Sequence, residues 1–420
     1  MCAIIGIYRK KTLKTSNKIV NFILENSKER GRDGYGKIDS LHCTIANFRA
    51  EPTNEYVKDK KDYDQQPYTL NHWSIVHNGT IANDEWLRTK QYPSSIDSAC
   101  IVEQLSISQE KDQYDNFINV IQRLKGSYAI LAINHNSEEL FIATNYKPIW
   151  FIETEDAYYF ASSEEYFPSD TYPKQTKPYS IHVVNKEGLT TLVDELRETN
   201  NKTLVVCSGG LDSSVVATLL KKEGHDIHLL HFLYGTRSEA KEKQAIQNVS
   251  EYLNCGYSFI PMYIYKNEDS GLLNDGIISP GKEGTEFANE WVPARNLVML
   301  SLAIAYAETN KFSYIALGNN LEESGAYPDN EQEFIRQFNK LIPFSVKAGH
   351  YLKLLMPIGN LMKKEIVKLG VEINAPLHLT WSCYHDHKLH CGNCGPCYMR
   401  KKAFLMNNLT EVIEYEQNNL

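Results

Sequence analysis

The 420-residue sequence lacks the features that mark membrane, secreted and nucleic-acid-binding proteins. No apolar run approaches the roughly eighteen residues of a membrane-spanning helix. The first apolar stretch is too short for a signal peptide, and its positive charges follow it rather than precede it. Basic residues are not in excess either, and the net charge of −8 gives no support to a nucleic-acid or membrane surface. We therefore expect a cytoplasmic protein with no membrane partner and no direct nucleic-acid partner.

Cysteine is unevenly distributed, because four of the nine cysteines lie close together near the C-terminus. Such a cluster indicates metal binding in a reducing compartment rather than disulfide bonds. The hydrophobic content of 42% is ordinary for a folded protein, and the length suits two or three domains.

Two patterns of secondary structure divide the sequence. Up to about residue 185, short strands and turns with helices at about 17–29 and 95–107 predict an α+β fold. The polar segment 185–202 is the expected linker, and the loop-like stretch 266–290 could close over a site. From residue 203 onwards, strands alternate with helices, which predicts a doubly wound parallel sheet. The strands are expected at 203–207, 226–233 and 313–318, and the helices at 213–223, 238–252, 295–309 and 363–370.

The stretch Leu204–Ser214, LVVCSGGLDSS, is the most informative part of the sequence. A β-branched strand runs into two glycines and a helix start, so backbone N–H groups and the helix N-terminus can approach an anion. Serine hydroxyls add donors, which makes phosphate the expected ligand. The Gly-Lys-Ser/Thr of the common P-loop is absent, so this is a different nucleotide loop.

The loop resembles the SGGxDS motif of the PP-loop ATP pyrophosphatases, which cleave ATP between the α- and β-phosphates to adenylate a substrate. The resemblance implies an ATP site in which Asp212 could also assist Mg²⁺. The residues that it predicts to bind ATP are Ser208, Gly209, Gly210, Leu211, Asp212 and Ser213.

A second candidate centre lies at the N-terminus. Cys2 follows the initiator methionine, and removal of Met1 would place a thiol on the N-terminal residue. The α-amine titrates near pH ~8, so it could act as the base for that thiol.

Motifs farther along the chain resemble those of class II glutamine amidotransferases. Arg30–Gly36 is similar to the RGPDGxG segment, with Arg32 in place of the usual proline, and His77–Thr80 is similar to the oxyanion motif. The resemblance covers about residues 1–185 and implies that Cys2 is the nucleophile. It assigns the oxyanion to Asn78 and Gly79, the glutamine α-carboxylate to Arg49 and the glutamine ammonium group to Asp97, and structural signatures match at Leu124–Ala129 and Phe160–Glu164.

The C-terminal cysteines Cys383, Cys391, Cys394 and Cys397 form a C-x7-C-x2-C-x2-C pattern within a module at about 380–405. Four thiolates at this spacing can close tetrahedrally around Zn²⁺, and a full shell indicates a structural metal. An iron–sulfur cluster also takes four cysteines and is the alternative.

The C-terminal half resembles the 7-cyano-7-deazaguanine synthase family over almost all of residues 203–405. The matching motifs, in order, are LYG, VPARNL, ALGNN, SGAYPDNEQEF, LMKKEIVKLG and LTWSCYHDHKLHCGNCGPC. The resemblance implies that ATP adenylates 7-carboxy-7-deazaguanine and that ammonia displaces AMP to give an amide. A second ATP then helps to dehydrate the amide to the nitrile. The resemblance also favours zinc over an iron–sulfur cluster.

Further site residues follow from the same resemblance. Lys363 would offset charge on the reacting phosphates, and a helix-surface lysine is the alternative. The predicted substrate-binding residues are Arg295, Asn296, Glu323, Tyr327 and Asp329. The sequence departs from the family at Asn330-Glu331, where Cys-Arg is common, and at Thr236, which replaces a glutamine.

Together these patterns predict an α+β Ntn-hydrolase-like domain at 1–190 and a doubly wound α/β (PP-loop, HUP-like) domain at 203–420 with a zinc module at 383–397. The predicted protein is a glutamine-dependent ATP ligase that makes the 7-amido or 7-cyano base for deazaguanine nucleic-acid modification. It would use Zn²⁺, ATP, Mg²⁺ and glutamine, and a homodimer is left open. Three alternatives also stay open: a defence ligase that joins the activated deazaguanine to a protein acceptor, an asparagine-synthetase-like amidation, and a zinc-stapled nucleotide sensor.

Overall fold

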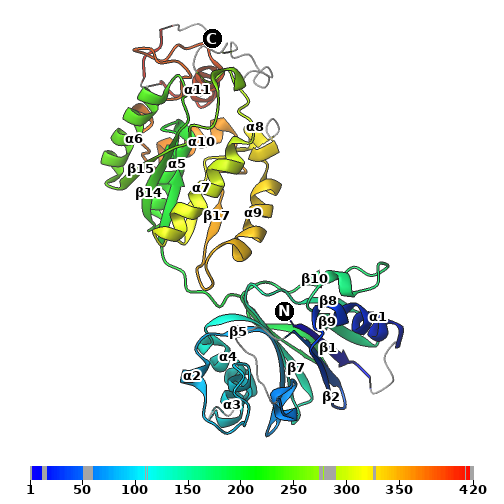
Figure 1. Cartoon of the computed structure of the whole chain (residues 1–420). Helices are drawn as coiled ribbons and strands as arrows, with labels where there is room; N and C mark the ends of the chain where they lie inside the picture. The colour runs from blue at the N-terminus through cyan, green and yellow to red at the C-terminus, as the bar shows by residue number, and fades with distance from the viewer. Residues whose placement is uncertain are drawn as a thin grey trace. The chain divides into compact units, whose positions relative to one another are not determined.

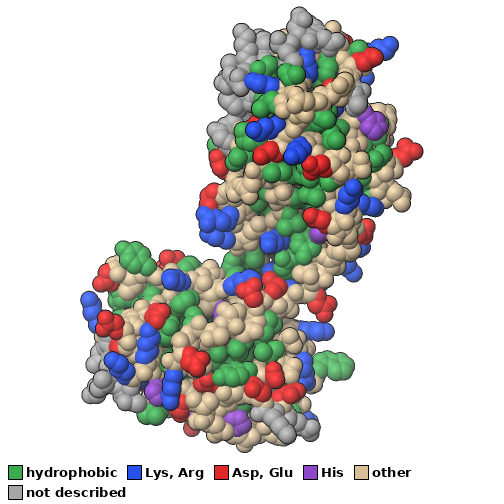
Figure 2. All heavy atoms as spheres, turned by 180° about the vertical axis from the view of Figure 1, so that it is seen from behind, with side chains coloured by type: hydrophobic (Ala, Val, Ile, Leu, Met, Phe, Trp, Pro, Cys, Tyr) green, Lys and Arg blue, Asp and Glu red, His purple; other side chains and the backbone are tan. Residues whose placement is uncertain are grey.

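The structure is a computed structural model that describes residues 2–11, 17–50, 60–108, 110, 112–273, 278, 290–324, 328–411 and 413–416. The chain divides into two compact units, Met1–Arg197 and Glu198–Leu420, each with its own sheets and helices (Figure 1). Among the described residues, no helix is long and apolar enough to cross a membrane. On the face shown in Figure 2, acidic and basic side chains are interspersed on both units.

The N-terminal unit contains two six-stranded sheets whose paired strands are antiparallel. The first sheet has the order β10-β8-β9-β1-β3-β2 and comprises β1 (Ala3–Arg9), β2 (Gly34–Asp39), β3 (Cys43–Arg49), β8 (Trp150–Glu153), β9 (Ala157–Ala161) and β10 (Lys174–Gln175). The second has the order β12-β11-β7-β6-β5-β4 and comprises β4 (Tyr68–Leu70), β5 (Trp73–Ile81), β6 (Gly126–Asn134), β7 (Glu139–Thr144), β11 (Ser180–Asn185) and β12 (Gly188–Val193).

Helices cover the outer faces of these two sheets, which gives four layers (Figure 1). The helices are α1 (Asn17–Ser27) on the first sheet, and α2 (Asp84–Leu87), α3 (Ala99–Ile107) and α4 (Gln113–Arg123) on the second. Strand β1 shows why its sequence is apolar throughout: Ile4 and Tyr8 pack between the sheets, while Ile5 and Ile7 pack in the core that includes α1 residues. Successive strand residues face opposite sides, so a strand buried on both sides needs no polar alternation.

The C-terminal unit contains one five-stranded parallel sheet of order β15-β14-β13-β16-β17. Its strands are β13 (Lys202–Val206), β14 (Asp226–Leu233), β15 (Gly256–Pro261), β16 (Tyr314–Ala316) and β17 (Lys353–Leu355). Its helices are α5 (Leu211–Lys222), α6 (Glu239–Leu253), α7 (Arg295–Thr309), α8 (Leu321–Ser324), α9 (Gln332–Ser345), α10 (Lys363–Glu372) and α11 (Gly395–Met406). Strands β14 and β15 follow one another on one side of β13, and β16 and β17 follow one another on its other side. The strand order therefore reverses between β13 and β16.

Both faces of this sheet are covered. Leu204 of β13 belongs to a core with α7 and α9, whereas Val205, the next residue, belongs to a core with α5, α6, α10 and α11. In doubly wound folds, ligands bind beyond the carboxyl ends of the strands at the point where the order reverses. The fold therefore directs attention to the loops that follow β13 and β16.

The sequence predicted this fold class, and the structure confirms it. The helix expected at 295–309 has the bounds of α7, but α4 and α9 were not anticipated. The expected linker 185–202 is partly wrong, because β12 occupies Gly188–Val193 and pairs with β11. Helix α3 begins four residues later than expected, since polar side chains in Ser94–Asp97 bond to other segments instead of extending the helix. Of the expected loop 266–290, residues 274–277 and 279–289 lie outside the described residues.

Candidate active sites

The N-terminal unit places Cys2 beside Arg49. Ala3 of β1 pairs with Phe48 of β3, so Cys2 comes next to Arg49 at the end of this antiparallel pair. The Cys2 thiol is half-buried and lies 3.7 Å from the Ala50 carbonyl oxygen. Arg49 is buried, and its Nη1 donates a hydrogen bond of 2.9 Å to the Asp64 carbonyl oxygen.

Asp64 connects this strand end to the segment before α3. Its carboxylate accepts hydrogen bonds from Ser94 Oγ at 2.8 Å and from Lys61 N at 3.0 Å. Asp64 is itself buried, so these bonds satisfy a carboxylate that would otherwise be costly to bury. Sequence reasoning did not single out Asp64, because the segment around it matches none of the amidotransferase motifs.

The second group of predicted residues lies at the end of β5. Gly79 has a φ of +152°, and a Cβ at this position would lie 1.9 Å from the Ser127 carbonyl oxygen on β6, so only glycine fits without a backbone shift. Asn78, its neighbour, is buried. Asp97 joins this group because its Oδ2 accepts a hydrogen bond of 2.5 Å from Ile81 N, while its Oδ1 accepts two from Ser98.

His77 precedes this pair and is fully enclosed. Its Nδ1 lies 2.7 Å from Ser98 Oγ, and its backbone N–H donates to Gln66 Oε1 at 2.7 Å. Burial lowers the pKa of His77 below its ordinary value, so the ring is neutral at pH 7. Ser98 therefore ties His77 to Asp97. Asp64 binds Ser94, so both groups of predicted residues contact the short segment before α3.

In the C-terminal unit, the predicted phosphate loop leads from β13 into α5. Gly209 has a φ of +77°, and its Cβ would lie 2.9 Å from the Glu242 carbonyl oxygen of α6. Gly210 is the N-cap of α5, and its N–H donates to Ser208 Oγ at 3.3 Å. The glycines thus let the loop press against α6 while the N-terminus of α5 stays exposed to a ligand.

A cavity of about 300 Å³ opens beside this loop. The predicted residues in its walls are Ser208, Gly210, Leu211, Asp212, Ser213, Arg295, Asn296, Asp329, Lys363 and Cys383. Its walls also include five side chains that sequence reasoning did not assign to the site: Tyr234, Glu242, Trp381, Tyr384 and Arg400. Tyr234, Trp381 and Tyr384 lie inside the motifs quoted above, but no spacing pattern marked Glu242.

Asp212 is a junction of charged groups at this cavity. Its Oδ2 is bound by Lys363 Nζ and accepts a hydrogen bond of 3.1 Å from Asn320 Nδ2. Lys363 is thus not a helix-surface lysine with an i,i+4 partner. Asp212 Oδ1 is a buried oxygen atom without a hydrogen-bond partner among the described residues. The same holds for Oε2 of Glu322, whose Oε1 accepts a hydrogen bond of 2.9 Å from Lys363 N.

Arg295 and Asn296 begin α7 at another wall. Arg295 donates to Asn296 Oδ1 at 3.2 Å and to the Tyr234 hydroxyl at 3.5 Å. Asn296 N donates to Asp329 Oδ2 at 3.2 Å, so this acid caps the amino end of α7. Glu323 lies in α8. Tyr327 lies outside the described residues.

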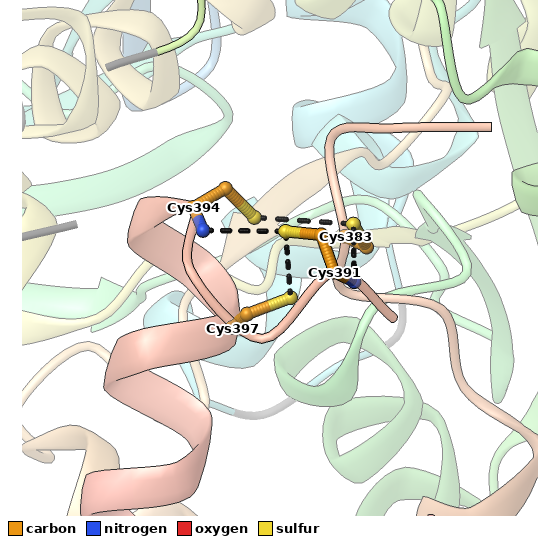
Figure 3. A group of neighbouring side chains, drawn as sticks. All are labelled: Cys383, Cys391, Cys394 and Cys397. Atoms are coloured by element: carbon orange, nitrogen blue, oxygen red, sulfur yellow. Dashed lines mark hydrogen bonds between the residues drawn. The ribbon is translucent and has the colours of Figure 1, made fainter. Parts of the chain in front are cut away.

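The four C-terminal cysteines converge as predicted (Figure 3). They are buried, and their sulfur atoms all lie within 4.8 Å of one another. Backbone N–H groups donate to the sulfur atoms of Cys383 and Cys391. Hydrogen bonds from the neighbouring thiols, that of Cys383 first, lower the pKa of Cys391. This donor set suits one tetrahedral metal ion.

The cysteine module also contacts the phosphate loop. Trp381 N donates a hydrogen bond of 2.8 Å to the Gly209 carbonyl oxygen. Arg400 of α11, which is buried, donates to Thr380 Oγ1 at 2.6 Å and to Ser382 Oγ at 3.2 Å, on either side of Trp381. The segment between α10 and the metal cluster therefore holds the loop against the fold.

Comparisons with known proteins find a matching family for each of the two units. Residues 202–408 match the family described as "Queuosine biosynthesis protein QueC", and residues 54–169 match the "Glutamine amidotransferase domain". The 7-cyano-7-deazaguanine synthase of Sulfolobus acidocaldarius is 41% identical over 99% of this chain and 100% of its own length, and that of Saccharolobus solfataricus is 38% identical over the same shares. The synthase of Methanothrix thermoacetophila is 37% identical over 51% of this chain and 99% of its own length.

Proposed function

Because the chain belongs to the 7-cyano-7-deazaguanine synthase family and carries a glutamine amidotransferase domain, we propose that it is a glutamine-dependent ATP ligase. Its substrate would be 7-carboxy-7-deazaguanine, and its products the 7-amido base and then the 7-cyano base, for nucleic-acid modification. The observation that carries the proposal is the cavity in which the phosphate loop, Lys363 and Arg295 meet. This cavity can hold ATP phosphates and a carboxylate together, as adenylation requires.

In the first half-reaction, the Cys2 thiolate attacks the side-chain amide of glutamine after Met1 has been removed. The free α-amine takes the thiol proton, ammonia leaves, and water then hydrolyses the glutamyl thioester. Asn78 and the Gly79 N–H stabilise the oxyanion, while Arg49 and Asp97 bind the α-carboxylate and the ammonium group. A glycine is required at position 79, because a Cβ would meet the Ser127 carbonyl oxygen, and this close packing fixes the backbone that carries the N–H.

In the second half-reaction, the substrate carboxylate attacks the α-phosphorus of ATP, which releases pyrophosphate and forms an acyl-adenylate. Ammonia displaces AMP to give the amide and a proton. The amide oxygen then attacks the α-phosphorus of a second ATP and releases a second pyrophosphate. Loss of AMP and of the two N–H protons leaves the nitrile. Lys363 offsets negative charge on the phosphates, and Arg295 positions the substrate carboxylate.

Among the described residues, one carboxylate oxygen of Asp212 and one of Glu322 have no hydrogen-bond partner, and carboxylate oxygens are the ligands that a hard divalent cation prefers. Mg²⁺ bound with ATP at these carboxylates would neutralise phosphate charge. Asp212 would then bind the cation with Oδ1 while its Oδ2 binds Lys363.

The metal of the cysteine cluster is proposed to be zinc with a structural role. Around a single Zn²⁺ with Zn–S bonds of about 2.3 Å, tetrahedral sulfur atoms lie about 3.8 Å apart. The Sγ atoms of Cys391 and Cys397 lie 4.0 Å apart, and so do those of Cys383 and Cys394. In an iron–sulfur cluster, inorganic sulfides separate the ligand thiolates, so spacings as short as these favour zinc.

The test supplies the protein with 7-carboxy-7-deazaguanine, ATP, Mg²⁺ and ammonium, and counts products. Nitrile formation with two AMP and two pyrophosphate per base supports the full sequence, and one of each with the amide supports a ligase that stops there. ATP cleavage that is not stimulated by this substrate would contradict the proposal.

A further inference from the structure

Glu242 is a carboxylate in the cavity wall that the proposed chemistry does not use. It extends from α6, and its side chain is 15% exposed. Ser238 Oγ donates to Oε1 at 2.7 Å, and Thr236 Oγ1 donates to Oε2 at 3.4 Å. His231 Nε2 lies 3.5 Å from Oε2. The carboxylate is thus held in position by two hydroxyl groups, whereas His231 Nε2 has no hydrogen-bond partner among the described residues.

These neighbours do not supply a compensating positive charge. Burial lowers the pKa of His231 to about 4, so its ring is neutral at pH 7. Burial likewise raises the pKa of Glu242 to about 7, which shows that the described surroundings stabilise its anion poorly. The other cavity carboxylates differ, because Asp212 pairs with Lys363 and Asp329 caps α7.

A fixed carboxylate of this kind fits a ligand that brings its own N–H donors. Two carboxylate oxygens accept two parallel N–H bonds, and ionised acceptors make the stronger hydrogen bonds. The N1–H and 2-amino groups of a guanine ring present two such donors side by side. An adenine edge offers a donor next to an acceptor, which matches an ionised carboxylate less well.

We infer that Glu242 is the specificity residue that binds the N1–H and 2-amino edge of the deazaguanine substrate, an inference that rests on the proposed function. The substitution of carbon for N7 leaves this edge unchanged. Arg295 lies in the wall of the same cavity and would bind the carboxylate at C7 of the substrate. One ligand would therefore pair its N–H edge with Glu242 and its carboxylate with Arg295. Tyr234, Trp381 and Tyr384 add aromatic side chains to the cavity wall, which suits a planar ring.

The test is a cycle of two enzymes and two substrates. Wild type and Glu242→Gln are each assayed with 7-carboxy-7-deazaguanine and with its analogue that lacks the 2-amino group, with ammonium as nitrogen source. Wild type should lose about 10- to 100-fold in kcat/KM with the analogue, as sites that hydrogen-bond a buried group do. Glu242→Gln should discriminate between the two substrates by less than about threefold, with the KM for ATP unchanged.

Two further variants sharpen the result. Glu242→Asp keeps the charge and should retain a preference for the 2-amino group at reduced affinity. Glu251→Gln makes the same substitution on the exposed part of α6 and should match wild type. Circular dichroism checks that each variant is folded.

Three outcomes would overturn the inference. Glu242→Gln could keep wild-type discrimination, it could raise the KM for ATP as much as that for the base, or it could lower kcat equally for both substrates. The last result would make Glu242 a proton acceptor. If wild type turns over neither substrate, the proposed function itself fails, so the two failures are distinguishable.

Discussion

The two units hold their functional side chains in different ways. In the N-terminal unit, backbone groups make several of the hydrogen bonds: Asp97 accepts from Ile81 N and Ser98 N, and Arg49 donates to the Asp64 carbonyl oxygen. In the C-terminal unit, side chains hold one another across the cavity, as in the pair of Asp212 and Lys363.

This difference reflects how each site is assembled. Strand pairing sets the N-terminal site, because its residues lie on or beside β1, β3 and β5. The C-terminal cavity takes residues from α5, α6, α7, α10 and the segment before the cysteine cluster, so it depends on packing between distant parts of the chain. The first site should therefore fail through single local changes, and the second also through loss of its supports.

The largest effect is expected for Asp212→Ala. It removes the carboxylate that binds Lys363 and Asn320 beside the phosphate loop, and with it the proposed ligand of Mg²⁺. ATP-dependent turnover should fall by about 10³-fold or more with either nitrogen source, while glutamine hydrolysis continues. Pyrophosphate release and glutamate release report the two activities, with the exposed Asp226→Ala as control. Retention of one tenth of the turnover would contradict this role.

Cys2→Ala should distinguish the activity of the N-terminal unit from that of the C-terminal unit. Without its nucleophile, glutamine-driven product formation should fall by about 10³-fold, whereas ammonium-driven formation should stay within about twofold. Both are measured as nitrile or amide by mass spectrometry. Loss of the ammonium-driven reaction as well would show that the units are not independent in this way.

Gly79→Ala tests the local design of the first site. The added Cβ would lie 1.9 Å from the Ser127 carbonyl oxygen, so the oxyanion N–H must move, and glutaminase activity should fall by about 10²-fold. Gly188→Ala is the matched control, because Gly188 also has a positive φ in the same sheet but its Cβ would meet only Tyr158 Oη, at 3.3 Å. Equal losses in both variants would point to backbone strain rather than the oxyanion site.

Metal removal tests the supports of the second site. Chelation should loosen the segment that carries Trp381, whose N–H holds the Gly209 carbonyl oxygen, and weaken ATP binding by about tenfold. Glutaminase activity should persist, and added Zn²⁺ should restore ATP binding as measured by calorimetry. Unchanged ATP affinity in the metal-free protein would show that the module does not support the loop.

Glu242→Gln should change the stability in a pH-dependent way. The unfolded carboxyl group ionises at its ordinary pKa, whereas the folded one keeps its proton up to about pH 7. The stability of the wild-type protein therefore decreases as the pH rises from the lower of these pKa values to the higher one. The variant does not lose this stability, because glutamine does not titrate. The variant should gain up to about 3 kcal/mol over wild type between pH 4 and pH 8. His231 has the opposite trend but is present in both proteins. Thermal unfolding at the two pH values measures the difference, and a gap independent of pH would contradict it.

The sequence predicted most of the architecture, since apolar periodicity and the glycine-rich loop are local signals. It also predicted the cysteine cluster, because short spacing brings such residues together. Glu242 and Asp64 escaped prediction, since each becomes significant only where distant segments meet. Glu242 reaches the cavity because Gly209 lets α6 pack against the phosphate loop, and no local pattern encodes that contact.

The most direct test of the account follows the amide nitrogen of glutamine. The purified protein, with zinc bound, is incubated with 7-carboxy-7-deazaguanine, ATP, Mg²⁺ and amide-¹⁵N glutamine, and the base is analysed by mass spectrometry. The account predicts a ¹⁵N-labelled amide or nitrile base whose formation requires Cys2. Release of glutamate and AMP without a labelled base would contradict the claim that the two units form one ligase.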